Sequence, residues 1–490
     1  MIAGPLLLVS LPLLVAPLIW LLRRWAALAA LLSAGTSLLL ALMSWYLPLD
    51  EPVPFWGREV ALGESVSVLG REMVMSDANR LALVLIFLIA AGLFTFAWRV
   101  SQGWTFYPLA MAVLGVLSGA LLIESHIYAV LFLQIAAALC VFLIQGGQIG
   151  STRGALRFLT FVTLAIAPIL VTSWYLGRYE WTPDDTSLLD TSVLLFAFGF
   201  AILLGVVPFH TWVPAVSQDA PPLVSTFILG IFYAVVWFIL LDLIESYQWL
   251  AAHPDFRTAL SYSGYTMIGL GALMASVQRR LGHLMGYAAL ADMGAAQVAL
   301  GLGTPAGLTA ALSALGARAI GLAVMAMGVS VIRHRAQGDD FDKLVGWGRH
   351  VPWSAAALVV GGLSLAGLPP GAGFAVRWSI TRLVARESTA GAIFLLLAAM
   401  AVGIGVVRAL QALFREPAPD YVGSEIVAEI EAKSKEGEVQ EPPEREPRLA
   451  SAIIIVGLGL CLALGLWPQL HMGIIKQVTE GYTFLSSISP

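Results

Sequence analysis

The sequence predicts an all-α polytopic membrane protein with about 14 transmembrane helices. Of its 490 residues, 59% are hydrophobic and only 12% are charged, whereas a soluble globular protein carries about 25% charged residues. The mean hydropathy is +0.84. The apolar residues are gathered in runs of about 20, which is the length that crosses the hydrocarbon core as a helix. These observations exclude an ordinary soluble domain.

Fourteen such runs follow one another, and each is predicted to form one span. The first has no basic residue before it and no cleavage-site pattern, so a span is expected there and not a removed signal peptide. In chain order the runs cover residues 2–22, 25–47, 78–98, 106–124, 126–145, 155–176, 190–215, 221–243, 256–277, 284–302, 305–332, 353–386, 390–413 and 449–468.

Positive charge predicts the orientation, because Lys and Arg collect in cytoplasmic loops. An even number of spans places both termini on one side of the membrane. Eight Lys and Arg residues lie on that side, and sixteen lie on the other. Both termini are therefore predicted to lie outside, which for a bacterial protein is the periplasmic side of the inner (cytoplasmic) membrane.

Two extramembrane segments interrupt the spans. Residues 51–77 alternate apolar and polar side chains, as at Val60, Leu62, Val66 and Val68, which predicts a small outer hairpin. Residues 415–448 are rich in Glu and Pro and cannot form a core, so a flexible acidic cytoplasmic linker is expected. One short helix is expected near residues 425–435. A solvated spacer is the preferred interpretation of this linker, and an element that docks a partner is the alternative.

Several kinds of chemistry are absent from the sequence. The net charge of −4 gives no basic surface for nucleic acid, and no glycine-rich phosphate loop indicates a nucleotide bound by this chain. Cys140 and Cys461 lie in apolar runs about 320 positions apart and are expected to be small core residues. No Cys/His cluster predicts a metal site. We therefore expect no metal, no cofactor and no catalytic residue in this chain.

Two of the predicted spans are interrupted by glycine and proline. One break carries Pro208 and the other carries Pro369 and Pro370. Proline removes a backbone donor, and within a membrane this is tolerated only where protein or a watery cavity satisfies the freed groups. Paired interruptions in two halves indicate inverted repeats with an ion or substrate path near the midplane. Two ordinary proline kinks are the alternative.

The motifs at these breaks resemble a known family. They read VVPFHTWVP at 206–214, followed by APPLVS at 220–225, and SLAGLPPGAGF at 364–374, with GYAALADMG at 286–294 between them. They are similar to signatures of the proton-antiporter-like subunits, which occur in respiratory complex I, its photosynthetic and membrane hydrogenase relatives and the multisubunit cation/proton antiporters. The resemblance covers roughly residues 75–413, and this chain is a divergent member.

The resemblance implies a 14-helix subunit of a large complex, with two inverted five-helix repeats that each contain one broken helix. Other membrane subunits and the lipid bilayer are the implied partners, and a quinone-reducing or hydrogenase module lies elsewhere in such complexes. The implied organisation is an N-terminal group of three helices at 1–98, the first repeat at 106–243, the second repeat at 256–413, the acidic linker at 415–448, and the last helix with an outer tail at 449–490.

The residues that carry protons in the family are replaced in this chain. Its only lysines are Lys343, Lys433, Lys435 and Lys476, and none lies in a predicted span. By the family's spacing, the two lysine positions are occupied by Leu203 and Ala234. Gln134 stands where the family has a glutamate, and Arg377 stands where it has a lysine or glutamate. The first three side chains do not titrate, and arginine stays protonated in proteins.

Few ionisable groups remain within the predicted spans. Charge there is costly, at about 2.5–3.5 kcal/mol at a helix centre, so these groups are functional candidates with structural alternatives. Asp292 and Arg318 are expected to pair across neighbouring helices, and Arg377 is expected to act as a fixed cation at a helix end. His210 either carries protons or caps freed backbone. The ion-path candidates are His210, Asp292, Arg318, Arg377 and Gln134; Glu124, His126 and Asp242 are expected at span ends, and Arg408 is expected to reach the interface.

Two functions are compatible with this pattern. The preferred one is a membrane-arm subunit of a complex I-like assembly, that is, an NADH/quinone or related energy-converting oxidoreductase, in which the proton path is altered or lost. Such a subunit has no catalysis of its own. The alternative is an ion or inorganic-carbon transporter subunit that uses other intramembrane charges.

Overall fold

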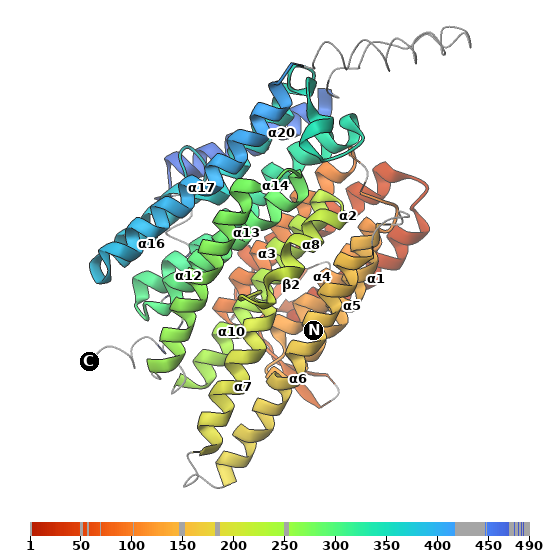
Figure 1. Ribbon diagram of the computed structural model, residues 1–490. Coiled ribbons are helices and arrows are strands. Elements are labelled where there is room, and N and C mark those ends of the chain that lie inside the picture. The colour runs from red at the N-terminus through yellow and green to blue at the C-terminus, as the bar shows by residue number, and fades with distance from the viewer. Residues whose placement is uncertain are drawn as a thin grey trace.

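The computed structural model describes residues 2–49, 52–55, 58–68, 70–100, 102–146, 152–181, 187–248, 254–416 and 448–469, together with Glu446, Ile475, Thr479, Tyr482 and Phe484. These residues form a bundle of long helices (Figure 1).

The N-terminal part combines three helices with short strands. The helices are α1 (Gly4–Leu21), α2 (Ala26–Tyr46) and α3 (Asp77–Ala97). The strands are β1 (Ile2–Ala3), β2 (Val53–Phe55), β3 (Arg58–Ala61), β4 (Val66–Val68) and β5 (Arg71–Met73).

The region predicted to form a small outer hairpin contains two antiparallel strand pairs. Strands β2 and β3 pair antiparallel, β1 joins them in a three-stranded sheet, and β4 and β5 form a separate pair. The alternation breaks at Gly63, whose amide donates to the carbonyl of Leu49 across 3.2 Å. A side chain at Gly63 would overlap that carbonyl, so the chain turns there and a second hairpin follows.

The middle of the chain holds the first interrupted helix. Helix α7 ends at Leu203 and α8 begins at Trp212, with a short 3₁₀ turn, η1 (Phe209–Thr211), before it. The helices of this part are α4 (Phe106–Leu122), α5 (His126–Gln145), α6 (Arg153–Trp181), α7 (Ser187–Leu203), α8 (Trp212–Asp219), α9 (Pro222–Thr226), the π-helical segment η2 (Phe227–Phe232) and α10 (Tyr233–Ser246).

The following part holds the second interrupted helix, between α15 and α16. Its helices are α12 (Pro254–Val277), α13 (Leu281–Gly301), α14 (Pro305–Ala336), the 3₁₀ turns η3 (Phe341–Leu344) and η4 (Trp347–Arg349), α15 (Pro352–Ala366), α16 (Gly373–Glu387) and α17 (Thr389–Phe414), and α20 (Arg448–Leu466) comes last.

The two interruptions share one backbone pattern. Gly205 and Gly367 end the first halves with φ of 69° and 76°, a left-handed conformation that glycine adopts without steric cost. At each site the glycine amide bonds to the carbonyl three residues back, and the next amide bonds to the carbonyl five residues back, as in a glycine-terminated helix. Pro208 and Pro370 each follow three residues later. Both predicted interruptions are confirmed.

Length and composition support an integral membrane protein. Among the described residues, nine helical stretches are long and apolar enough to span a membrane, and three shorter apolar helices accompany them. The long stretches are Gly4–Leu21, Ala26–Tyr46, Asp77–Ala97, His126–Gln145, Arg153–Tyr179, Pro222–Ser246, Pro305–Ala336, Thr389–Phe414 and Arg448–Leu466; the shorter are Phe106–Leu122, Ser187–Leu203 and Pro352–Ala366. The total of 14 spans stays a prediction.

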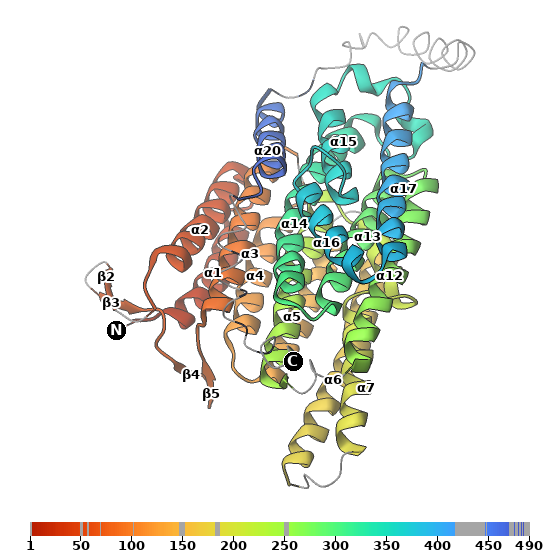
Figure 2. The ribbon, with the colours of Figure 1, turned by 90° about the vertical axis from the view of Figure 1, so that its left-hand side faces the viewer.

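Burial separates a central group of helices from the periphery. In the most apolar 18-residue segment of Pro222–Ser246, 94% is buried, and the corresponding value for Pro305–Ala336 is 83%. For α1 and α20 the values are only 33% and 22%. Figure 2 shows α1 and α2 at one edge of the bundle and α12 and α17 at the other, with α14 between them. Polar side chains on α10 and α14 are thus held in the interior of the bundle.

Most of the predicted acidic linker, including the expected short helix at 425–435, lies outside the described residues. At its described ends, Arg349 and Glu416 form an ion pair of 3.1 Å. The carboxylate of Glu446 accepts hydrogen bonds from the amides of Trp353 (3.3 Å) and Ser354 (2.8 Å). A carboxylate at this position is favourable because the first amides of α15 lack partners within the helix.

Candidate functional site

Three buried charged side chains meet where α13, α14 and α16 pack together. The Nε of Arg318 lies 2.7 Å from Oδ2 of Asp292, and Nη2 of Arg377 lies 3.3 Å from Oδ1 of the same carboxylate. The side chains of Arg318, Arg377 and Asp292 are 1%, 6% and 11% exposed. We call these three residues the buried charge cluster. The expected pairing of Asp292 with Arg318 is confirmed.

Small residues bring the supporting helices close together. Gly264 on α12 and Gly294 on α13 face each other so closely that a Cβ on either would overlap the other's backbone oxygen. Gly271 on α12 is equally close to α13, because a Cβ there would overlap the backbone of Ala291. This close approach lets Asp292, in the middle of α13, reach the neighbouring helices while it stays shielded from lipid.

Arg377 is positioned by the second helix interruption. Its Nη2 also lies 3.5 Å from the carbonyl of Leu365, which is one of the carbonyls at the end of α15 that lack a helical partner. The Cβ and Cγ of Arg377 pack directly against Gly367, where a side chain would overlap them. Arg377 therefore places a cation at the end of α15, as expected, and it also contacts Asp292.

Tyr233 completes the surroundings of the buried charge cluster and was not predicted. Its ring centroid lies 5.0 Å from Cζ of Arg318, a cation–π distance. Its hydroxyl donates to the carbonyl of Leu204 across 3.3 Å, at the first helix interruption. A tyrosine within an apolar run resembles an ordinary core residue, so the sequence carries no signal for this contact.

The electrostatics of the buried charge cluster favour fixed charges. It holds two guanidinium groups and one carboxylate, for a formal charge of +1, and both oxygens of Asp292 are engaged. Nη2 of Arg318 is buried without a hydrogen-bond partner. Removing one partner of a buried ion pair destabilises a protein by about 3–5 kcal/mol, so the three side chains hold one another in place.

The other replaced relay positions add no charge to this cluster. Leu203 is buried at the end of α7 and Ala234 is buried near the start of α10. The amide of Gln134 on α5 donates to the hydroxyl of Thr163 on α6 across 2.9 Å. None of these side chains supplies a charge in the interior.

His210 lies in the first interruption and is half-buried, and its Nδ1 has no hydrogen-bond partner. Among the described residues, no hydrogen bond or ion pair joins His210 or Gln134 to the buried charge cluster. Of the five candidates for an ion path, the structure therefore brings together Asp292, Arg318 and Arg377.

The remaining charged candidates occupy helix ends. Glu124 is exposed, and a ring nitrogen of His126 lies 2.9 Å from the hydroxyl of Ser246. Asp242 is half-buried near the end of α10. The guanidinium of Arg408 donates to the carbonyl of Ser276 in the last turn of α12, and the expectation that Arg408 reaches the interface stays a prediction.

Cys140 and Cys461 are both free and buried, as expected. No group of three or more His, Cys, Asp or Glu side chains within the described part of the chain could hold a metal ion.

Comparison with known families and proteins gives a consistent result. Residues 159–405 match the model of the family described as NADH:quinone oxidoreductase/Mrp antiporter, TM. The chain is 30% identical to NADH-quinone oxidoreductase subunit N of Ruthia magnifica subsp. Calyptogena magnifica over 207 residues, which is 41% of each chain. It is 28% identical to formate hydrogenlyase subunit 3 of Escherichia coli (strain K12) over 361 residues, which is 69% of this chain and 56% of that protein. The chain thus covers less than two thirds of the length of these relatives.

Solved structures share the fold along almost the whole chain. Similarity to a chain of the Mrp complex from Dietzia sp. DQ12-45-1b has a TM-score of 0.78 at 19% identity and covers 99% of this chain and 98% of that one. Similarity to a chain of respiratory complex I from Thermus thermophilus has a TM-score of 0.77 at 21% identity. It covers 99% of this chain and 100% of that one. Similarity to a chain of an archaeal membrane-bound sulfane sulfur reductase has a TM-score of 0.79 at 16% identity. It covers 99% of this chain and 98% of that one.

Proposed function

The chain belongs to the NADH:quinone oxidoreductase/Mrp antiporter family of membrane proteins, whose model matches half of its length, and we propose that it is a membrane-arm subunit of a complex I-like assembly with an altered or lost proton path. The solved relatives are chains of large membrane complexes, which supports other membrane subunits as partners. The subunit shapes and stabilises such an arm, and it does not carry a proton through the usual relay.

The buried charge cluster is the observation that carries this proposal. A relay needs groups that gain and lose protons, and a buried lysine or glutamate does so because desolvation shifts its pKa. Here a guanidinium of Arg377 stands at the family's position for such a group, and Asp292 is held between two guanidinium groups. Arginine does not release its proton in proteins, so the two guanidinium groups of the cluster cannot act as proton carriers.

The proposed organisation is two inverted five-helix repeats at 106–243 and 256–413, within 14 spans. The N-terminal helices at 1–98 and the last helix with its tail at 449–490 flank the repeats, and the acidic linker occupies 415–448. The shared backbone pattern at Gly205 and Gly367 supports the repeats. The charge count of the loops supports both termini outside, and a bacterial inner membrane is the proposed location.

Proton flux through liposomes that contain the full-length chain tests this function. With an imposed pH gradient, we expect the wild-type chain to conduct no faster than protein-free liposomes. The triple variant Gln134→Glu, Leu203→Lys, Ala234→Lys restores titratable groups and is expected to raise the flux.

The decisive outcome is a wild-type flux well above background. If that flux disappears in Asp292→Asn or His210→Ala while the variant concerned keeps the wild-type elution profile, the proposal is wrong. Copurification with quinone-reducing or hydrogenase subunits supports the assembly, and loss of the arm in a deletion strain supports a structural role.

A second candidate function is transport of another ion, with inorganic carbon as the cargo. The formal charge of +1 in the buried charge cluster and the unpartnered Nη2 of Arg318 favour an anion over a cation. Uptake of labelled bicarbonate into the same liposomes, abolished in Arg318→Gln but not in the exposed control Arg280→Gln, would support this candidate over the first.

A further inference from the structure

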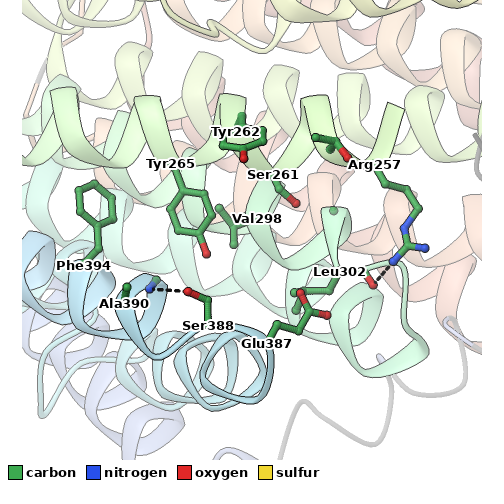
Figure 3. Close-up of a pocket in the computed structure, with 13 residues that line it drawn as sticks. Arg257, Ser261, Tyr262, Tyr265, Val298, Leu302, Glu387, Ser388, Ala390 and Phe394 are labelled. Atoms are coloured by element: carbon green, nitrogen blue, oxygen red, sulfur yellow. Dashed lines mark hydrogen bonds between the residues drawn. The ribbon is translucent and has the colours of Figure 1, made fainter. Parts of the chain in front are cut away.

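An open pocket of about 810 Å³ lies between α12, the end of α13 and the junction of α16 with α17. None of the residues that line it belongs to the buried charge cluster. Figure 3 shows Arg257 at one end and Phe394 at the other, with the side chains of Ser261 and Tyr265 pointing into the space between them. Glu387 enters from the opposite wall. The pocket is therefore charged at one end and apolar at the other.

The charged end carries one cation and one anion that do not pair with each other. Arg257 donates from Nη2 to the carbonyl of Leu302 across 2.6 Å, while its Nε is buried without a partner. Glu387 is exposed, and no ion pair is formed by it among the described residues. A purely anionic guest would satisfy Arg257 and be repelled by Glu387. A guest with both charges satisfies the two side chains together.

The apolar end continues into a surface that faces lipid. Phe394 and Tyr265 form an edge-to-face ring pair with centroids 5.9 Å apart, and Val298 closes the floor. Beyond Phe394, Leu397 and Met400 of α17 are 59% and 58% exposed on a helix apolar enough to span the membrane. An acyl chain can leave the pocket along this surface.

The polar end lies at the ends of two helices, where the headgroup region of a bilayer is expected. Arg257 is in the first turn of α12, and Glu387 is the last residue of α16, two positions before α17 begins at Thr389. The pocket thus has a headgroup end and a chain end in the order in which a phospholipid presents them.

We propose that this pocket binds a phospholipid with a zwitterionic phosphoethanolamine headgroup. The phosphate binds the guanidinium of Arg257, and the ammonium binds the carboxylate of Glu387. A primary ammonium donates hydrogen bonds to the carboxylate and to the hydroxyls of Ser261 and Tyr265, which a quaternary choline group cannot do. One acyl chain packs on Phe394. The lipid fastens the α16–α17 junction to α12.

Native mass spectrometry of the full-length chain, with any partner that stays bound in detergent, tests this proposal. The delipidated protein is titrated with phosphatidylethanolamine, phosphatidylglycerol or free phosphoethanolamine. We expect phosphatidylethanolamine to bind about tenfold more tightly than phosphatidylglycerol, and Arg257→Gln and Glu387→Gln each to weaken it about tenfold, as expected for one charge-assisted contact. The neighbouring exposed Arg386→Gln is the control and is expected to bind as the wild type does.

Three results would overturn the proposal. Equal binding of the two lipids removes the zwitterionic preference, and competition by free phosphoethanolamine at the same concentration makes the site one for a soluble ligand. A protein subunit that occupies the pocket and excludes both lipids makes it a protein interface. Because Arg257 also bonds to Leu302, Glu387→Gln serves as the variant with no structural contact, and unchanged binding in it would equally refute the site.

Discussion

The phenol ring of Tyr233 lies 5.0 Å from the guanidinium carbon of Arg318, and its hydroxyl bonds to the carbonyl of Leu204. One side chain thus contacts both the backbone at the first helix interruption and the buried charge cluster. Since Leu204 and Arg318 belong to the two proposed repeats, Tyr233 is a direct physical link between them.

Two substitutions of Tyr233 measure its two contacts separately. Tyr233→Phe keeps the ring over Arg318 and loses the hydrogen bond to Leu204, which is expected to lower the free energy of unfolding by about 1 kcal/mol. Tyr233→Leu also removes the ring, and the loss of a buried cation–π contact adds about 2 kcal/mol. Thermal unfolding of both variants in the same detergent measures the difference. Equal losses would show that the ring adds nothing beyond the hydroxyl.

Arg318→Met leaves Asp292 with Arg377 alone in the interior. We expect a loss of about 3–5 kcal/mol, as for other broken buried ion pairs. The matched control is Arg280→Gln, which breaks an ion pair of similar length, 2.8 Å, whose side chains are 49% and 38% exposed; exposed pairs contribute less than about 1 kcal/mol. Chemical denaturation gives both values. A loss in Arg318→Met no larger than in the control would contradict the structural importance of the cluster.

The second interruption depends on a close contact at Gly373. Its amide donates to the hydroxyl of Ser364 across 3.0 Å, and a Cβ there would overlap the carbonyl oxygen of Ser364. Gly373→Ala is therefore expected to destabilise the protein by about 1–3 kcal/mol. Gly92→Ala, at a helical glycine with open space around it, is expected to stabilise by up to about 1 kcal/mol. Melting temperatures that shift in the same direction would contradict this assignment.

His283, one residue before the predicted span 284–302, makes stability depend on pH. Burial lowers its pKa, the guanidinium of Arg280 lowers the pKa further, and Asp339, Asp219 and Asp340 oppose this. The unfolded chain then binds the proton more readily than the folded one, so stability falls as the pH drops below about 6.5. We expect the melting temperature of His283→Gln to differ less between pH 7.5 and pH 5.5 than that of the wild type.

The control for this measurement is a substitution of an exposed histidine, His334→Gln. Its melting temperature is expected to differ between pH 7.5 and pH 5.5 by as much as that of the wild type. An unchanged difference in His283→Gln would assign the acid sensitivity to other groups.

The sequence predicts the parts of this structure that follow from burial and backbone chemistry. Both interruptions were predictable because proline at Pro208 and Pro370 lacks the backbone donor of the helix ladder, and glycine readily adopts the left-handed conformation that ends a helix. The pairing of Asp292 with Arg318 was predictable because two isolated charges within a membrane are each costly.

Other features depend on three-dimensional packing and carry no local signal. The contact of Arg377 with Asp292 depends on the direction in which α16 resumes after the break. The contact of Tyr233 with Arg318 crosses 85 positions of sequence. The second strand pair was missed because the turn at Gly63 depends on Leu49, which lies 14 positions earlier.

The salt bridge between Asp292 and Arg318 also constrains how the protein is made. Each of α13 and α14 carries a charge near its middle, and insertion of such a helix alone costs about 2.5–3.5 kcal/mol. Only three residues separate the end of α13 at Gly301 from the start of α14 at Pro305, so the two helices leave the ribosome in immediate succession as a hairpin. Entering the bilayer together, they present a neutral pair, which makes this hairpin a single unit of membrane insertion.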